Sequence, residues 1–237
     1  MGRAKTIEML LMDGRADGRV KCSLPGNWVG KVYKIPRESI ELGKTRKDLN
    51  QSGVYFLFGK TPEGKPEVYV GQAVERKNGH GITQRLLEHK KPSEDYWTEA
   101  VVLTTSDNSF GPTEVSYLEH KFYQMAVDAG QYEVHNANDP NAGNVSEEKE
   151  AELESHVENT LLIIATLGYK VFAKNPEQKS PVVSTDKKHH NVHCFSQSND
   201  ADANGILTED GEIIVLKGSR VSDKISPSFE KRDMVFI

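Results

Sequence analysis

Five residues between positions 55 and 119 of this 237-residue chain have side chains suited to chemistry on a phosphate ester. They are Tyr55, Tyr69, Arg85, His89 and Glu119. A helix would place Arg85 and His89 on one face, one turn apart. The planar guanidinium of arginine suits a phosphodiester better than the point charge of lysine does, and an imidazole exchanges protons near neutral pH. A guanidinium and an imidazole so placed suit phosphate binding and proton exchange, although an Arg/His pair on a helix is usually solvated surface and tyrosines in strands are usually structural.

Glu119 falls on the apolar face of a predicted helix. Val115, Phe122 and Ala126 lie at helical spacing from it and indicate a buried stripe. A carboxylate in such a position must be paired, protonated or bound to a metal ion. Both a semi-buried ion pair with Arg85 and a metal site are compatible with this pattern.

A β-hairpin is predicted to carry the two tyrosines. Residues 53–58 and 67–71 are rich in aromatic and β-branched residues, and a loop containing proline, glycine and lysine separates them. Folding the chain about this loop brings Tyr55 and Tyr69 close together on adjacent strands, in a register that the sequence does not define.

Further elements follow the hairpin. Residues 82–91 predict a short helix that Pro92 stops, and residues 100–105 predict a third strand. Two longer helices are then expected. The first begins at Pro112 and ends at Gly130, and the second is capped by Ser146 and Gly168.

The two ends of the chain have a different composition. Residues 5–35 predict short strands joined by turns, and residues 37–50 predict a polar, helix-compatible connector. Residues 175–191 have the composition of a linker. Residues 205–208 and 212–217 then predict a second hairpin.

The charge of the chain divides sharply at Lys91. Residues 1–91 carry a formal net charge of +8, whereas residues 92–237 carry −13, and the whole chain carries −5. A basic half can meet phosphates while an acidic half favours solubility. Two ordinary solvated faces would give the same distribution.

The order of these motifs resembles the GIY-YIG endonuclease superfamily. The matching features are Gly53-Val54-Tyr55, Tyr69-Val70-Gly71, a helical Arg85 with His89 one turn on, a helical Glu119 and a downstream Asn136. Residues 97–102, 117–120 and 167–172 resemble more specifically the bacterial branch in which the nuclease precedes a small C-terminal domain of unknown function. Residues 215–219, Val-Leu-Lys-Gly-Ser, resemble the hallmark of that domain.

The resemblance implies an α+β fold with a small antiparallel β-sheet flanked by helices. The expected parts are an N-terminal β-rich extension (1–50), the GIY-YIG nuclease-like domain (51–173), a linker (174–191) and a partial C-terminal domain containing β-structure (192–237). The implied function is a metal-dependent endonuclease that hydrolyses DNA phosphodiester bonds. The alternative is a nucleic-acid-binding or partner-recruiting module whose nuclease site is inactive.

The resemblance also implies roles for individual residues. Glu119 would hold one Mg²⁺ or Mn²⁺ ion together with water molecules, and Arg85 would neutralise charge on the phosphate. Tyr69 would orient the attacking water, and either Tyr55 or His89 would act as its base, because an unperturbed tyrosine is a poor base at neutral pH.

Two further groups of residues complete the implied site. Asn136 would support the architecture or the water shell of the metal, and Asn138 is the alternative for this position. The phosphate-contacting residues expected on DNA are Lys60, Lys65, Arg76, Lys77 and Arg85.

Other features of the sequence bear on the surroundings of the protein. No segment is long and apolar enough for a membrane span, and the first residues lack the features of a secretory signal, so we expect a cytoplasmic protein with no membrane partner. Cys22 and Cys194 are then expected to be reduced thiols. Residues 187–194 include four histidines and cysteines that favour either a flexible linker or, with less support, a zinc site.

Overall fold

The computed structural model describes residues 4–76, 79–91, 94–136 and 139–173, and the backbone of three strands between residues 190 and 215. The chain divides into two compact units, Met1–Gln178 and Lys179–Ile237. The residues of the candidate nuclease site all belong to the first unit.

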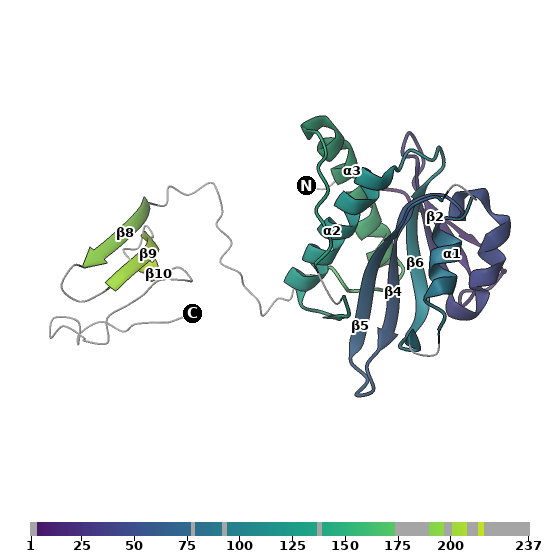
Figure 1. The fold of residues 1–237 in the computed structure, drawn as a ribbon, viewed down its shortest axis with the longest axis horizontal. Coiled ribbons are helices and arrows are strands. Elements are labelled where there is room, and N and C mark those ends of the chain that lie inside the picture. Colours follow the sequence, from purple (N-terminus) through teal and green to yellow (C-terminus); the bar gives the residue numbers. More distant parts are fainter. Residues whose placement is uncertain are drawn as a thin grey trace. The chain divides into compact units, whose positions relative to one another are not determined.

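A seven-stranded sheet forms the centre of the first unit, in the order β1-β2-β3-β6-β4-β5-β7 (Figure 1). The strands are β1 (Glu8–Leu11), β2 (Val20–Ser23), β3 (Gly30–Pro36), β4 (Gly53–Lys60), β5 (Pro66–Ala73), β6 (Trp97–Thr105) and β7 (Glu133–Val134). The pairing of β5 with β7 is parallel and the other pairings are antiparallel.

The prediction of a small antiparallel sheet is therefore wrong in size and in type, although the α+β class is confirmed. The sheet is larger because β3 pairs with β6 along seven residues, from Gly30 opposite Thr105 to Pro36 opposite Glu99. This pairing adds the predicted N-terminal strands to the sheet that contains the tyrosine hairpin. The sheet is mixed because the chain returns after the second helix and adds β7 beside β5.

Helical segments cover both faces of this sheet (Figure 1). The helix α1 (Ile82–Glu88) and the 3₁₀ helices η1 (Arg37–Thr45) and η2 (Lys47–Leu49) contribute to one buried cluster, together with Tyr33, Tyr55 and Leu57. The helices α2 (Pro112–Ala129) and α3 (Glu147–Thr166) contribute to the other. Side chains alternate between the faces of a strand, so residues 55, 57 and 69 share the α1 face.

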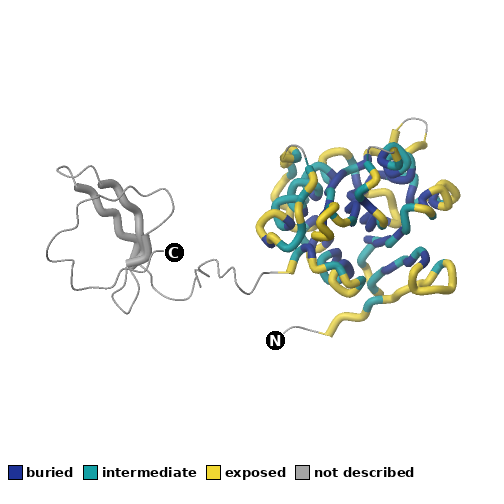
Figure 2. Tube along the Cα trace, turned by 90° about the horizontal axis from the view of Figure 1, so that it is seen from below, coloured by how far each residue is buried: buried dark blue, intermediate teal, exposed yellow. Residues whose placement is uncertain are grey.

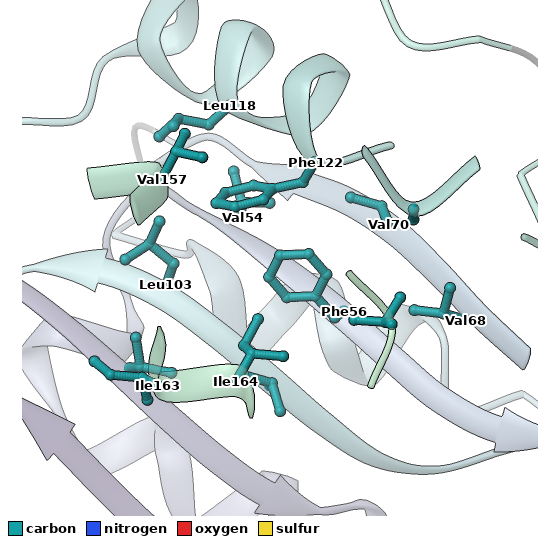
Figure 3. Packing of buried hydrophobic residues seen from close by; sticks show 14 of the residues in the cluster. Val54, Phe56, Val68, Val70, Leu103, Leu118, Phe122, Val157, Ile163 and Ile164 are labelled. Atoms are coloured by element: carbon teal, nitrogen blue, oxygen red, sulfur yellow. The ribbon is translucent and has the colours of Figure 1, made fainter. Parts of the chain in front are cut away.

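The cluster beneath α2 and α3 is the larger core. Phe56 on β4 packs edge-on against Phe122 on α2, with ring centroids 5.1 Å apart (Figure 3). Buried residues line the interior of the first unit, and exposed residues lie on its loops and outer helix surfaces (Figure 2). This packing holds α2 against the β4 and β5 strands and so determines where Glu119 lies.

The predicted ends of α2 and α3 and the predicted start of α1 at Ile82 are confirmed, with Gly168 one residue beyond Leu167, the C-cap of α3. Gly130 ends α2 in the left-handed conformation with a φ of 60°, Pro112 is the first residue of α2, and Ser146 caps α3 by accepting a hydrogen bond from the Lys149 amide at 3.3 Å. The helix α1 ends at Glu88, before the predicted residue 91, because the amide of Lys90 bonds instead to the carbonyl of Leu87 in a tighter turn.

The second unit contains a three-stranded antiparallel sheet in the order β10-β9-β8. The strands are β8 (His190–Ser196), β9 (Ala201–Leu207) and β10 (Ile213–Val215). The predicted second hairpin is confirmed as β9 and β10. The strand β8 was not predicted, because its polar composition resembles a linker. The side chains that decide between a linker and a zinc site at 187–194, Cys194 included, lie outside the described residues.

Within the part of the chain described here, no helix is long and apolar enough to cross a membrane. Cys22 is a buried free thiol on β2.

A buried histidine on α3 gives the first unit a pH-dependent stability. His156 is only 4% exposed and lies between the rings of Trp28 and Phe110, with centroid distances of 5.8 and 5.1 Å. Its Nδ1 has no hydrogen-bond partner among the described residues. Burial lowers the pKa of His156, and the nearby carboxylates of Glu152 and Asp107 only partly oppose this effect.

We therefore expect stability to fall as the pH drops through the ordinary range of histidine. The unfolded chain binds a proton there that the folded chain resists binding, so acid favours unfolding and neutral pH favours folding. In His156→Gln the decline in urea midpoint between pH 7.5 and 5.5 should become smaller than in wild type. The exposed His135→Gln is the control for losing a histidine, and equal declines in wild type and His156→Gln would contradict the assignment.

Candidate active site

The pairing of β4 with β5 brings the two motif tyrosines onto one face of the sheet. Tyr55 lies opposite Gly71, and Tyr69 lies opposite Leu57, so the tyrosines are diagonal neighbours. Their rings stack with centroids 6.2 Å apart. Tyr55 is fully buried and Tyr69 is partly exposed.

Gly71 is required by the position of the Tyr55 ring. A Cβ atom at residue 71 would lie 2.5 Å from both Cζ and the hydroxyl oxygen of Tyr55, and 2.7 Å from a ring carbon of Tyr69. These separations are far below van der Waals contact. The absence of a side chain at Gly71 therefore allows the phenol to lie across the neighbouring strand.

Hydrogen bonds join Tyr55, His89 and Glu94 in a row. The Tyr55 hydroxyl lies 2.8 Å from Nε2 of His89, and Nδ1 of His89 lies 2.5 Å from a carboxylate oxygen of Glu94. His89 is 8% exposed, whereas the Glu94 side chain is 32% exposed. The row thus leads from a buried phenol to a carboxylate in contact with solvent.

Burial shifts the pKa values of Tyr55, His89 and the neighbouring Tyr69. It raises the pKa of Tyr55 and of Tyr69, and it lowers the pKa of His89. The hydrogen bond to Glu94 opposes the lowering of the His89 pKa without cancelling it. At neutral pH the phenol therefore keeps its proton and the imidazole is available to accept one.

Arg85 lies beside this row. Partial burial works to lower its pKa, but interaction with the Tyr55 hydroxyl and a hydrogen bond to Glu88 outweigh burial and raise it. Arg85 pairs with Glu88 at 3.1 Å, and Arg76 pairs with the same carboxylate at 2.8 Å. The two guanidinium groups line a pocket of about 280 Å³ together with Gln72, Ala73, Val74, Glu75 and Gly81.

Glu119 approaches the site from the opposite face of the sheet. Its carboxylate is half-buried, and Gln72, the residue after Gly71 on β5, lies close enough to influence its pKa. Burial raises the pKa of Glu119, while Gln72 and the positive charge of Arg85 oppose the rise. The partner of Arg85 within ion-pair distance is Glu88, and no such pair joins Arg85 to Glu119, both of which the structure describes.

One carboxylate of this kind fits a Mg²⁺ ion. No group of three or more histidine, cysteine, aspartate or glutamate side chains in the described ranges could hold a metal ion. Mg²⁺ usually keeps several water molecules and binds through one or two carboxylates together with substrate phosphates. Glu119, half-buried and close enough to Arg85 to sense its charge, meets that requirement.

Asn136 lies at the edge of the sheet next to the second tyrosine. Its side-chain oxygen accepts a hydrogen bond from the Val70 amide at 3.0 Å, and its side-chain nitrogen donates one to the Val70 carbonyl at 2.7 Å. The side chain thus continues the pairing of β7 with β5 and supports the strand between Tyr69 and Gly71. Of the two roles expected for Asn136, this geometry favours the architectural one. The alternative residue, Asn138, lies outside the described residues.

The predicted phosphate-contacting residues separate into two places. Arg76 and Arg85 share the pocket, whereas Lys60 and Lys65 lie at the far end of the hairpin. Lys60 lies five positions after Tyr55, or about 17 Å along a strand. Lys77 lies outside the described residues.

Four further residues at the site were missed by the sequence analysis. Glu94, Glu88 and Gln72 contact motif residues, and Arg37 bonds to the backbone around Glu94. Glu88 could have been found, since it lies three residues after Arg85 on the same helix. The contacts of Glu94, Gln72 and Arg37 depend on tertiary packing and leave no local signal.

No protein-family model, no curated protein and no solved structure matches the chain. The function is therefore inferred from the residues and their geometry.

Replacing Gly71 by alanine should displace the Tyr55 ring and destabilise the protein by roughly 1–3 kcal/mol, as other overpacked core positions do. In a Tyr55→Ala background the ring is gone, and the same substitution should then cost less than half as much. Urea unfolding of the four proteins in this double-mutant cycle measures the coupling. An equal cost in both backgrounds would show that the Tyr55 ring does not occupy this space.

Proposed function

We propose that this protein is a GIY-YIG-type endonuclease that hydrolyses DNA phosphodiester bonds with a divalent metal ion. The observation that carries the proposal is the 2.8 Å hydrogen-bond contact between the buried Tyr55 hydroxyl and Nε2 of His89, with Arg85 close enough for its charge to act on both groups. A phenol and a neutral imidazole in contact can move a proton, and the guanidinium near them can bind a phosphate.

The arginine pocket supports a phosphate as the group that is bound. Arg85 and Arg76 both line it, and both are held by one carboxylate, that of Glu88. A phosphate oxygen accepts the same bidentate hydrogen bonds from arginine as a carboxylate does. The net charge of +8 on residues 1–91 favours the approach of a polyanion such as DNA.

Glu119 is the residue that would hold the Mg²⁺ or Mn²⁺ ion. When bound, such an ion polarises the phosphoryl oxygen and stabilises negative charge on the leaving 3′ oxygen. Arg85 stabilises the charge that develops on the phosphate during attack.

The proton of the attacking water leaves through Tyr55 and His89 in series. The oxygen of water forms a bond to phosphorus as the bond between phosphorus and the 3′ oxygen breaks. The water proton passes to the Tyr55 oxygen while the Tyr55 proton passes to Nε2 of His89, which becomes an imidazolium. The products are a 5′-phosphate and a 3′ oxygen that takes a proton from solvent, and His89 later releases its proton.

In this proposed series Tyr55 and His89 act together as the base, and neither acts alone. Because the pKa of Tyr55 is raised, its side chain is a neutral phenol and not a phenolate at neutral pH. Tyr55 can therefore accept the water proton only as it passes its own proton to His89. The lowered pKa of His89 keeps the imidazole neutral and ready to receive that proton. Tyr69, stacked on Tyr55, orients the water.

Glu119→Gln should abolish metal-dependent cleavage while leaving the fold intact. We expect the rate to fall at least about 100-fold, because a neutral amide is a poor ligand for Mg²⁺. The measurement is nicking of supercoiled plasmid and of labelled branched and single-stranded oligonucleotides, with Mg²⁺ or Mn²⁺ and with a chelator. Asp128→Asn, an exposed carboxylate on the same helix, is the matched control and should cleave like wild type.

Two outcomes would count against this assignment. Equal cleavage by wild type and Glu119→Gln would place the activity elsewhere. DNA binding without cleavage of any of these substrates would favour the alternative, a nucleic-acid-binding or partner-recruiting module with an inactive nuclease site.

A further inference from the structure

The carboxylate of Glu94 determines which nitrogen of His89 carries the proton. An ionised carboxylate can only accept hydrogen bonds, so Nδ1 of His89 must donate across the 2.5 Å contact with Glu94. In a neutral imidazole the other nitrogen, Nε2, is then an acceptor. This tautomer is the one in which Nε2 can receive the proton of the Tyr55 hydroxyl, 2.8 Å away.

We infer that Glu94 is a positioning residue that fixes His89 in the Nδ1-protonated tautomer and stabilises the imidazolium formed when Tyr55 gives up its proton. The role in hydrolysis rests on the proposed function, whereas the tautomer is a property of the free protein. Glu94 does not line the phosphate pocket, and its hydrogen bond within the site is the one to His89.

The backbone around Glu94 is held by a residue from outside the nuclease-like region. Arg37, at the start of η1, donates hydrogen bonds to the carbonyls of Glu94 at 2.8 Å and of Trp97 at 3.4 Å. Its guanidinium stacks over the Trp97 ring at 4.4 Å. The N-terminal segment, which joins the central sheet through β3, thus supports the position of Glu94.

His89 is fixed from its other side as well. The Trp97 indole nitrogen donates to the His89 carbonyl at 3.2 Å, and the rings of Tyr55 and Tyr69 lie 5.5 and 5.2 Å from the imidazole. Because the imidazole ring is held in place, what can still vary at His89 is which of its two ring nitrogens carries the proton. Glu94 is the group in contact with His89 that can decide it.

The charges that face His89 are mixed in sign. Glu94 and Glu88 favour the imidazolium, whereas Arg85 on α1 and the buried surroundings oppose it, and the neutral phenols of Tyr55 and Tyr69 pack against the ring. Neutralising Glu94 therefore removes a favourable charge and should lower the pKa of His89. This direction distinguishes a positioning role from a general loss of packing.

The first test determines the tautomer of His89 by nitrogen NMR of histidine-labelled protein without DNA or metal. In wild type, Nδ1 of His89 should show a protonated, pyrrole-type shift and Nε2 an unprotonated, pyridine-type shift. Glu94→Gln, whose amide oxygen still accepts from Nδ1, should keep this tautomer but titrate at a lower pH than wild type. Glu94→Ala should lose the preference, and Glu38→Gln, an exposed carboxylate on η1, should behave like wild type.

The second test measures how the rate of DNA cleavage depends on pH. The fall in rate on the acid side of the profile reports protonation of His89. In Glu94→Gln this fall should move to lower pH. The maximal rate should decrease at least about 10-fold, because the imidazole is then a weaker base. A structural role would lower the rate without moving the acid side of the profile.

The outcomes separate the inference from the proposed function. A wild-type His89 protonated on Nε2, or a Glu94→Ala spectrum identical to wild type, overturns the inference whatever the activity is. The expected spectra in a protein that cleaves no substrate support the tautomer and reject the nuclease.

Discussion

The close approach of the Tyr55 ring to the backbone of Gly71 is the constraint on which the rest of the site depends. The phenol can lie across the neighbouring strand only because residue 71 has no side chain. That position brings the hydroxyl to Nε2 of His89 at the end of α1. It also leaves Gln72, the next residue on β5, on the other face, where Gln72 opposes the rise in the pKa of Glu119. A single strand segment thus links the two halves of the site.

Burial and nearby charges then shift the pKa values of the site's side chains in different directions. The interior raises the pKa values of the phenol and of the Glu119 carboxyl and lowers that of the imidazole. Arg85 lies among these groups and opposes the rise at both Tyr55 and Glu119. Of these groups, the phenol of Tyr55 and the imidazole of His89 are in hydrogen-bond contact, and such pairs of unequal proton affinity are the usual basis of acid–base catalysis. The arrangement also explains why the pocket is lined by arginine side chains, which keep their charge when partly buried.

Local patterns predicted much of the fold because they are determined by local physics. The tyrosine hairpin, the glycine that ends α2 and the serine that caps α3 follow from strand composition and from the chemistry of helix ends. The size of the sheet could not be predicted in this way, since the pairing of β3 with β6 joins residues about 70 positions apart in the sequence. The parallel addition of β7 is non-local in the same sense.

The same distinction applies to the candidate site. Tyr55, Tyr69, Arg85, His89 and Glu119 stand out by residue type and spacing, and the structure places them around one end of β5. Glu94 does not stand out, because its contact with His89 depends on a turn that Arg37 holds from a distant part of the chain. Asn136 stands out as a polar residue, but its pairing with the Val70 backbone could not be deduced from its type.

Anomalous diffraction from crystals grown with Mn²⁺ and a phosphorothioate oligonucleotide that resists cleavage would show whether Glu119 holds a metal ion beside a DNA phosphate. We expect a manganese ion about 2 Å from a Glu119 carboxylate oxygen. A non-bridging phosphate oxygen should bind the same ion and contact Arg85, on the side of β5 where Tyr55 meets His89. Oligonucleotide bound elsewhere, or bound at Arg85 with no manganese at Glu119, would contradict this expectation.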